Sequence, residues 1–309
     1  MPASTTAVLP NMTSAVTLGA ALAMIAAAAF AGGASVALVS LGHRPRQVLL
    51  SLTGGVLLGV GMLHLLPHAC LELGGDVDAA AGWALGGFFL MFLLERAFHA
   101  HAHHAVDEGH DHGADGCTSA IHHHHDHRHG ASRGRWAWCG ALAGLTLHSL
   151  ADGAALAASV RADALHGAGL FAGVATFLAI LLHKPLDAGI IATLMVESGV
   201  SPRWRTIVNA AYAAVVPLGA AVFLVSLPFA RGREDAVLGV ALALAAGAFI
   251  CIAAADLLPE VQFHSHDRLL LTTALAMGLA IAWGMTMLER SSHGHAAHGH
   301  GPAAARSAP

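Results

Sequence analysis

The stretch FLAILLHKPLDAGIIATLM, residues 177–195, decides the fold class because it is long, apolar and broken by only a few polar side chains. An α-helix needs about 20 apolar residues to cross the hydrocarbon core of a bilayer. This run nevertheless holds Lys184 and Asp187 beside His183. Ionisable side chains within a membrane are costly unless they are paired or hydrated. We therefore interpret the stretch as a membrane-spanning helix that carries a functional site.

The composition of the whole chain agrees with this interpretation. Of 309 residues, 56% are hydrophobic and 11% are charged, with a mean hydropathy of +0.63. Soluble domains carry about 25% charged residues. The formal net charge of −4 does not suggest binding to nucleic acid. The chain is predicted to be an integral membrane protein.

Apolar blocks along the chain predict eight transmembrane helices and an all-α fold class. Helices are expected because a spanning segment must satisfy its own backbone hydrogen bonds in lipid. The predicted spans are 15–41, 47–70, 79–98, 136–160, 167–197, 204–229, 235–260 and 269–289.

Arginines near the span ends predict the orientation, since cytoplasmic loops carry the excess of basic residues. Nine lie in or beside the odd-numbered loops and five on the other side. Both termini are thus predicted outside a cell membrane, either an inner or a plasma membrane. The predicted parts are an N-terminal tail with helices one to three (1–98), a cytoplasmic disordered loop (99–135), helices four to eight (136–290) and an extracytoplasmic disordered tail (291–309).

Histidine is the unusual residue of this chain. Of its 24 histidines, twelve lie in residues 99–130, and others lie in the tail. Imidazole is a common metal ligand, so such a segment is typical of weak, exchangeable metal binding. A plain solvated linker is the alternative. The predicted loop ligands are the four consecutive residues His122, His123, His124 and His125.

Two neighbouring spans each contain a histidine and an aspartate four residues apart. His148 and Asp152 lie in the fourth span, and His183 and Asp187 lie in the fifth. Residues four apart share one face of a helix. Two imidazoles and two carboxylates suit a divalent ion such as Zn²⁺. Polar pairs that serve helix packing are the alternative, but the repeated spacing favours a metal site.

Pro185 follows this fifth-span histidine. Proline has no N–H, so the carbonyl of Leu181 loses its helical partner and a kink is expected.

Polar pairs also lie near the ends of two other spans. His64 and His68 are candidates for a metal entrance, and Asp256 and Glu260 are candidates for an exit. Interfacial side chains without a role in transport are the alternative for both pairs.

At these residues the chain resembles the ZIP (Zrt/Irt-like) family of divalent metal transporters. HSLADG at 148–153 and HKPLDAG at 183–189 resemble the family motifs of helices four and five. HLLP at 64–67, PLGA at 217–220 and DLLPE at 256–260 are also similar to family signatures. The resemblance implies eight helices, termini outside, a histidine-rich cytoplasmic loop and a metal site at the same four residues, His148, Asp152, His183 and Asp187.

The chain departs from the family where many members hold a second metal ion. The ligand positions of that second site hold Ser149, Lys184 and Val216. A cation beside a divalent ion repels it strongly where the dielectric constant is low. A mononuclear site is therefore predicted. The chain resembles the branch of the family that also has H-K in the fifth helix.

The resemblance implies a secondary transporter, not an enzyme, that moves Zn²⁺ toward the cytoplasm by alternating access. Fe²⁺, Mn²⁺, Cd²⁺ and Co²⁺ are further candidate substrates, and no cofactor is expected. Helices one, four, five and six are expected to slide against helices two, three, seven and eight. Glycine-rich helices suit such close sliding contact, and the second span contains Gly54, Gly55, Gly59 and Gly61.

Two other functions share part of this pattern. Exporters of the cation-diffusion-facilitator class also use histidine–aspartate pairs, but they resemble six spans with a soluble C-terminal domain. An intramembrane metalloprotease needs a glutamate base as in H-E-x-x-H, whereas Lys184 follows His183 here. The expected partners are divalent metal ions and the lipid bilayer, and a homodimer is the assembly considered.

Overall fold

The computed structural model describes residues 12–35, 43–103, 137–165, 172–263 and 268–296. These residues form helices joined by short turns, and no strand occurs among them. Eight of the helical segments are long and apolar enough to cross a membrane. The predicted all-α fold with eight spans is confirmed.

Each predicted span corresponds to one helix or to a stack of consecutive helices. The first four spans are α1 (Met12–Ser35), then α2 (His43–Val60) with the π-helical turn η1 (Gly61–Leu65) and α3 (Leu66–Glu72), then α4 (Val77–His103) and α5 (Ala137–Leu165). The last four are α6 (Val174–Glu197), then α7 (Pro202–Ala213) with α8 (Val215–Ser226) and the 3-10 turn η4 (Leu227–Ala230), then α9 (Glu234–Phe263) and α10 (Arg268–Ala296).

Two helices continue into segments that were predicted to be disordered. α4 extends to His103, and α10 extends to Ala296. Alanine and histidine alternate near the end of α4, and alanine is the best helix former. The predicted boundaries at 98 and 290 therefore stop short of the helix ends.

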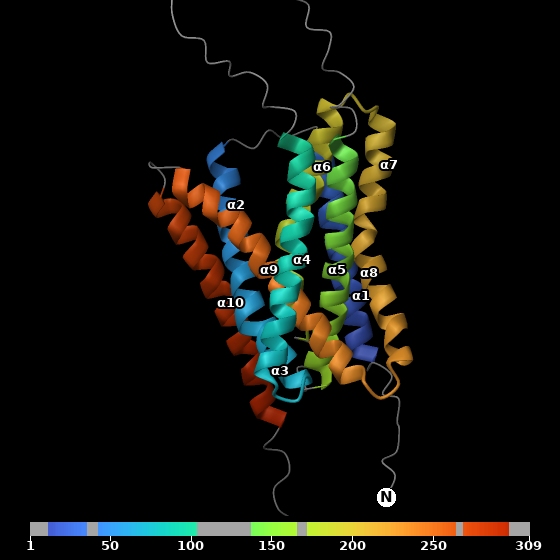
Figure 1. The fold of residues 1–309 in the computed structure, drawn as a ribbon, viewed down its shortest axis with the longest axis vertical. Helices are drawn as coiled ribbons and strands as arrows, with labels where there is room; N and C mark the ends of the chain where they lie inside the picture. The colour runs from blue at the N-terminus through green and yellow to red at the C-terminus, as the bar shows by residue number, and fades with distance from the viewer. Residues whose placement is uncertain (1–11, 36–42, 104–136, 166–171, 264–267, 297–309) are drawn as a thin grey trace, which may run out of the picture.

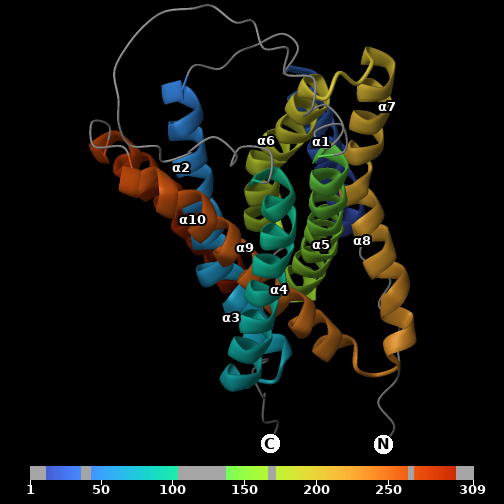
Figure 2. The same cartoon turned by 45° about the horizontal axis from the view of Figure 1, so that its top comes forward.

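The bundle has two ends that are defined by the chain itself (Figures 1 and 2). α1 begins and α10 ends at the same end, which we call the terminal end. α4 ends and α5 begins at the opposite end, which we call the loop end. This arrangement follows from an even number of spans.

The helices form two groups that stand side by side (Figure 1). The first, the α5 group, contains α1, α5, α6, α7 and α8, with its closest packing between α1 and α6 and between α5 and α8. The second, the α9 group, contains α2, α3, α4, α9 and α10, with its closest packing between α2 and α10 and between α4 and α9. The groups correspond to the two sets of helices that the family resemblance implied.

Glycines allow the closest helix approaches within a group. A Cβ at Gly247 of α9 would lie 1.8 Å from the carbonyl oxygen of Ala84 in α4. The second-span glycines likewise meet helices of their own group, since Gly55 and Gly59 approach α10 and Gly61 approaches α9. The expectation that these glycines form the sliding contact is wrong, because they hold one group together.

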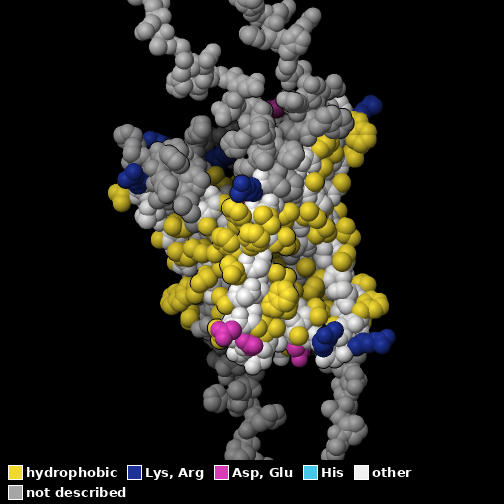
Figure 3. Space-filling view, viewed as in Figure 1, with side chains coloured by type: hydrophobic (Ala, Val, Ile, Leu, Met, Phe, Trp, Pro, Cys, Tyr) yellow, Lys and Arg dark blue, Asp and Glu magenta, His cyan; other side chains and the backbone are white. Residues whose placement is uncertain are grey.

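On the face of the bundle that Figure 3 shows, hydrophobic side chains cover the middle, and charged side chains gather toward the two ends. Large apolar residues are more than half exposed, for example Leu85, Phe89, Val222 and Trp283. A contiguous apolar belt of this kind marks a lipid-facing surface. Several polar side chains are instead buried among the helices, and they define the candidate sites.

Candidate metal centre

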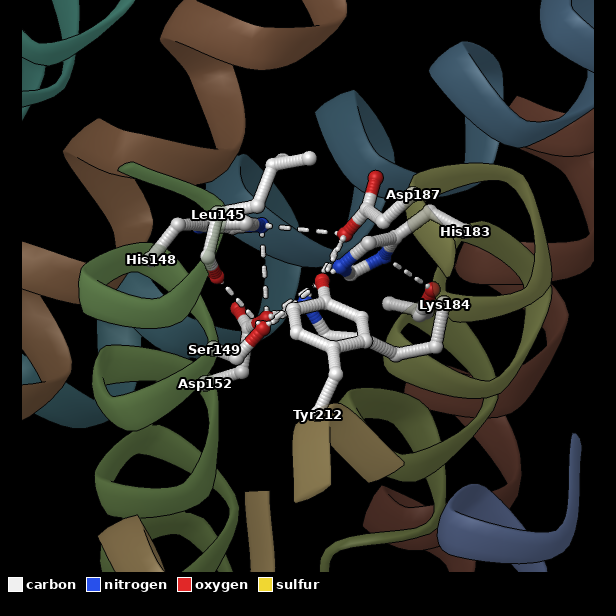
Figure 4. A network of polar contacts seen from close by, with 9 residues as sticks. Leu145, His148, Ser149, Asp152, His183, Lys184, Asp187 and Tyr212 are labelled. Atoms are coloured by element: carbon white, nitrogen blue, oxygen red, sulfur yellow. Dashed lines mark hydrogen bonds and ion pairs between the residues drawn. The ribbon is translucent and has the colours of Figure 1, made fainter. Parts of the chain in front are cut away.

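Two predicted histidine ligands converge on the carboxylate of a third predicted ligand between α5 and α6 (Figure 4). The Nε2 atom of His148 lies 3.3 Å from Oδ2 of Asp152, and the Nε2 atom of His183 lies 3.3 Å from the same oxygen. All three residues are buried. One ligand atom from each residue lies within 4.8 Å of the others. This spacing suits a divalent ion held by imidazole nitrogens and a carboxylate oxygen.

The ring of His183 is oriented by its own helix. Its Nδ1 atom lies 2.8 Å from the carbonyl oxygen of Ala179, one turn earlier in α6. A hydrogen bond from Nδ1 fixes the tautomer and leaves Nε2 as the free electron-pair donor. The local helix thus presents the nitrogen that faces Asp152.

Asp187, the fourth predicted ligand, lies at the edge of this cluster. Its Oδ2 atom is 3.9 Å from Nε2 of His148 and 2.9 Å from the ammonium of Lys184. Its side chain is 15% exposed, whereas the side chain of Asp152 is 2% exposed. The structure therefore brings three ligands into one cluster and places the fourth beside it, paired with a lysine.

Lys184 is fully buried and has a partner for each of its three N–H donors. It forms ion pairs with Asp152 and Asp187, and it donates to the hydroxyl of Ser149 at 3.0 Å. An ammonium group has three donors and no acceptor. A buried charge is tolerated when it is paired and hydrogen-bonded in this way. Lys184 and Ser149, two of the predicted vestigial second-site positions, are thus in direct contact.

The third vestigial position, Val216, is buried in α8. Tyr212 of α7, which lies in the same span, is instead the residue that joins the polar network. The hydroxyl of Ser149 lies 2.9 Å from the hydroxyl of Tyr212, which donates to Asp187 at 3.4 Å. Tyr212 was not among the predicted site residues. A signal was present, because Tyr212 is the only tyrosine in the chain and lies one helical turn before Val216.

Pro185 lies inside α6, which continues unbroken as one helix from Val174 to Glu197. α1 approaches it closely, since a Cβ at Gly32 would lie 2.4 Å from the Pro185 carbonyl oxygen. The predicted kink stays a prediction.

A second cluster forms toward the terminal end. The two entrance candidates, His64 and His68, lie close to Asp163 of α5. Nδ1 of His68 is 2.9 Å from Oδ1 of Asp163, and Nε2 of His64 is 3.7 Å from Oδ2. Asp163 was not among the predicted site residues, because the predicted fourth span ended at residue 160. The available signal was its spacing of eleven residues, about three helical turns, from Asp152.

The remaining candidate residues lie outside the described side chains. Asp256 and Glu260 belong to α9, but their side chains are not among those described. His122, His123, His124 and His125 lie outside the described residues.

An eight-span helical bundle with buried clusters of histidine and aspartate defines a class, the membrane proteins that handle metal ions. Comparison with known proteins narrows this class to one family. The model of the ZIP zinc transporter family matches residues 14–286. This chain therefore belongs to the ZIP family of zinc transporters and is a multi-pass membrane protein.

Curated relatives agree with this assignment. Zinc transporter ZIP1 of Danio rerio is 25% identical over 260 residues, covering 76% of this chain and 82% of the relative. Zinc transporter ZIP2 of Mus musculus is 26% identical over 269 residues, covering 77% of this chain and 84% of the relative.

Proposed function

We propose that this chain moves Zn²⁺ across the membrane toward the cytoplasm through a mononuclear site. The proposed ligands are His148, Asp152, His183 and Asp187. The observation that carries the proposal is the convergence of two imidazole Nε2 atoms on one buried carboxylate oxygen. Two carboxylates offset the charge of the ion, which lowers the cost of burying it.

Lys184 explains how the ion can bind reversibly. Without an ion, its ammonium group neutralises part of the charge on Asp152 and Asp187. Zn²⁺ binds carboxylate oxygen at about 2.0–2.2 Å, so an incoming ion must compete with the lysine for Asp152. Lys184 can keep its bonds to Asp187 and Ser149 meanwhile. This competition weakens binding, and a transporter must release its substrate.

The same lysine argues against a second ion. Its ammonium lies within hydrogen-bond distance of Ser149 and Asp187, where a second divalent ion would need its own ligands. Repulsion between a divalent ion and a nearby cation is strong in a buried site. We therefore expect the central site to bind one ion.

Zinc is the proposed main substrate. Imidazole nitrogen and carboxylate oxygen are both good zinc ligands, and the two relatives carry the name zinc transporter. Fe²⁺, Mn²⁺, Cd²⁺ and Co²⁺ accept the same donor types, so they remain candidate substrates.

The proposed direction and location rest on the arginine distribution. It places the terminal end outside and the loop end in the cytoplasm of a plasma or inner membrane. Assembly as a homodimer and metal binding by the histidine-rich loop stay predictions.

Alternating access can use the two helix groups. The ligands and Lys184 all lie on α5 and α6, and Tyr212 lies on α7, so the whole central network belongs to the α5 group. Movement of this group against the α9 group would carry the ion without disturbing its ligands. A shift of packed helices is a common form of such transitions.

The test is uptake of radioactive zinc by purified protein in liposomes. Inside-out and right-side-out populations are distinguished by whether an added protease can reach the histidine-rich loop. We expect zinc to enter right-side-out liposomes, and Asp152→Asn to abolish this flux. Zinc entry only into inside-out liposomes would support the exporter alternative. Equal flux through Asp152→Asn and the unchanged protein would contradict the proposed site.

A further inference from the structure

We propose that His64, His68 and Asp163 form a second metal-binding site that joins the two helix groups at the terminal end. It would take a borderline divalent ion such as Zn²⁺, as expected for two imidazoles and one carboxylate. The binding itself is independent of the transport direction. Only its role as the first binding point for an incoming ion rests on the proposed function.

The donor atoms are already close together. One ligand atom each from His64, His68 and Asp163 lies within 4.8 Å of the others. The two oxygens of Asp163 face different imidazoles, with His68 at 2.9 Å and His64 at 3.7 Å. Side-chain exposure is 18% for His68 and 1% for the other two. The site is therefore reached from the side of His68.

Neighbouring groups hold these donors in place. The backbone N–H of Gly173 donates to Oδ2 of Asp163 at 2.6 Å. Nε2 of His64 lies 3.0 Å from the hydroxyl of Ser159, which accepts a hydrogen bond from Thr176 at 2.9 Å. The contact from Gly173 is an outer partner of the kind that orients a metal ligand. Ser159 contacts the same imidazole nitrogen of His64 that would bind the ion, so an incoming ion must displace this hydroxyl or bind it. Ser159 or a water molecule can complete a tetrahedral set.

The helix around His64 is locally modified. His64 lies in the π-helical turn η1, between α2 and α3. π-Helical turns are rare overall, but those that occur are often found at functional sites. Because His64 and His68 are four residues apart, they share one helix face and can approach one carboxylate.

The two clusters differ in how they relate to the helix groups. His64 and His68 belong to the α9 group, whereas Asp163 belongs to the α5 group. A metal ion here would link the groups, and movement of one group would take its ligand set apart. The central ligands travel together, because they lie within one group. Binding at the terminal end would thus favour the arrangement in which the two groups meet there.

Apolar side chains separate the two clusters. Leu156 of α5 lies along the helix between Asp152 and Asp163, and Ile180 of α6 lies between Thr176 and His183. Both are fully buried. The two clusters share no residue, so a substitution can remove the donors of one and leave those of the other in place.

The test measures zinc bound per full-length chain for matched variants in detergent. The variants are Asp163→Asn, His68→Gln, Asp152→Asn and, as a control, Asp78→Asn, which removes an exposed acid at the start of α4. Histidines outside the two clusters are unchanged in all four, so their contribution cancels. We expect Asp163→Asn and His68→Gln each to bind one ion fewer than Asp78→Asn.

Equal zinc content in Asp163→Asn, His68→Gln and Asp78→Asn would overturn the proposal. Circular dichroism and size-exclusion profiles check folding. If Asp163→Asn does not fold, His68→Gln still tests the proposal, because it changes a partly exposed side chain. In Asp152→Asn, zinc should slow hydrogen exchange in η1, α3 and the end of α5 together; protection of one group alone would contradict the link. The zinc flux of Asp152→Asn separately decides the proposed function.

Discussion

Lys184 of α6 and Asp152 of α5 form a buried ion pair that joins the two helices at the centre of the bundle. The same oxygen of Asp152 faces both histidines of the candidate metal centre. A fixed internal cation and an incoming metal ion therefore share one ligand.

Loss of a central ligand should stop transport while the fold persists. His148→Ala and Asp187→Ala each remove one donor, and we expect flux to fall at least about tenfold, since even outer partners of metal ligands change affinity by about 10–100-fold. Zinc uptake by liposomes measures the flux, and circular dichroism verifies the helices. Normal flux in either variant would remove that residue from the site.

Replacing the internal cation by a carboxylate should create room for a second ion. Lys184→Glu would place three carboxylates together, so the chain without metal should be less stable and zinc should restore its unfolding temperature. Metal analysis should find one more ion than in Lys184→Met, which removes the charge without adding a ligand. An unchanged metal content would contradict the role given to Lys184.

The single tyrosine offers a local probe of the centre. Because Tyr212 contacts Ser149 and Asp187, its signal in a protein labelled at tyrosine should shift when zinc binds. NMR of the labelled chain would show one tyrosine signal. In Asp152→Asn the shift should disappear at the same zinc concentration; a shift that persists would place the responding ion elsewhere.

Tight helix packing predicts a stability difference between two glycines. Gly247→Ala should lower the free energy of unfolding by about 1–3 kcal/mol, as overpacking does, because a Cβ there would clash with Ala84 of α4. Gly284→Ala is the control, since no neighbouring atom lies within 4 Å of its added Cβ. Thermal unfolding in detergent compares them, and equal stability would refute the close contact.

Removal of the histidine-rich segment should leave transport active and change its regulation. α4 continues to His103, so a deletion of 104–130 keeps the helix complete. Uptake should continue, with an altered dependence on zinc concentration. If the deletion abolished flux in a folded chain, the segment would belong to the transport pathway.

Much of the fold could be predicted from the sequence, because each span must satisfy its backbone hydrogen bonds internally. The paired spacing of His148 with Asp152 and of His183 with Asp187 indicated two faces that could share an ion. Hydrophobic length located the spans, but it placed their ends less well, which is why Asp163 was missed.

By itself, the sequence determined a bundle of eight spans with a polar pair in each of two neighbouring helices. The spans and the polar pairs are local in sequence, because apolar length and spacing along one helix depend only on residues close together in the chain. Only the tertiary structure decided that Lys184 bonds to Asp152, that Tyr212 reaches Ser149, and that His68 of one helix group meets Asp163 of the other. These contacts depend on how separate helices rotate and pack, and side-chain spacing within one helix does not specify that.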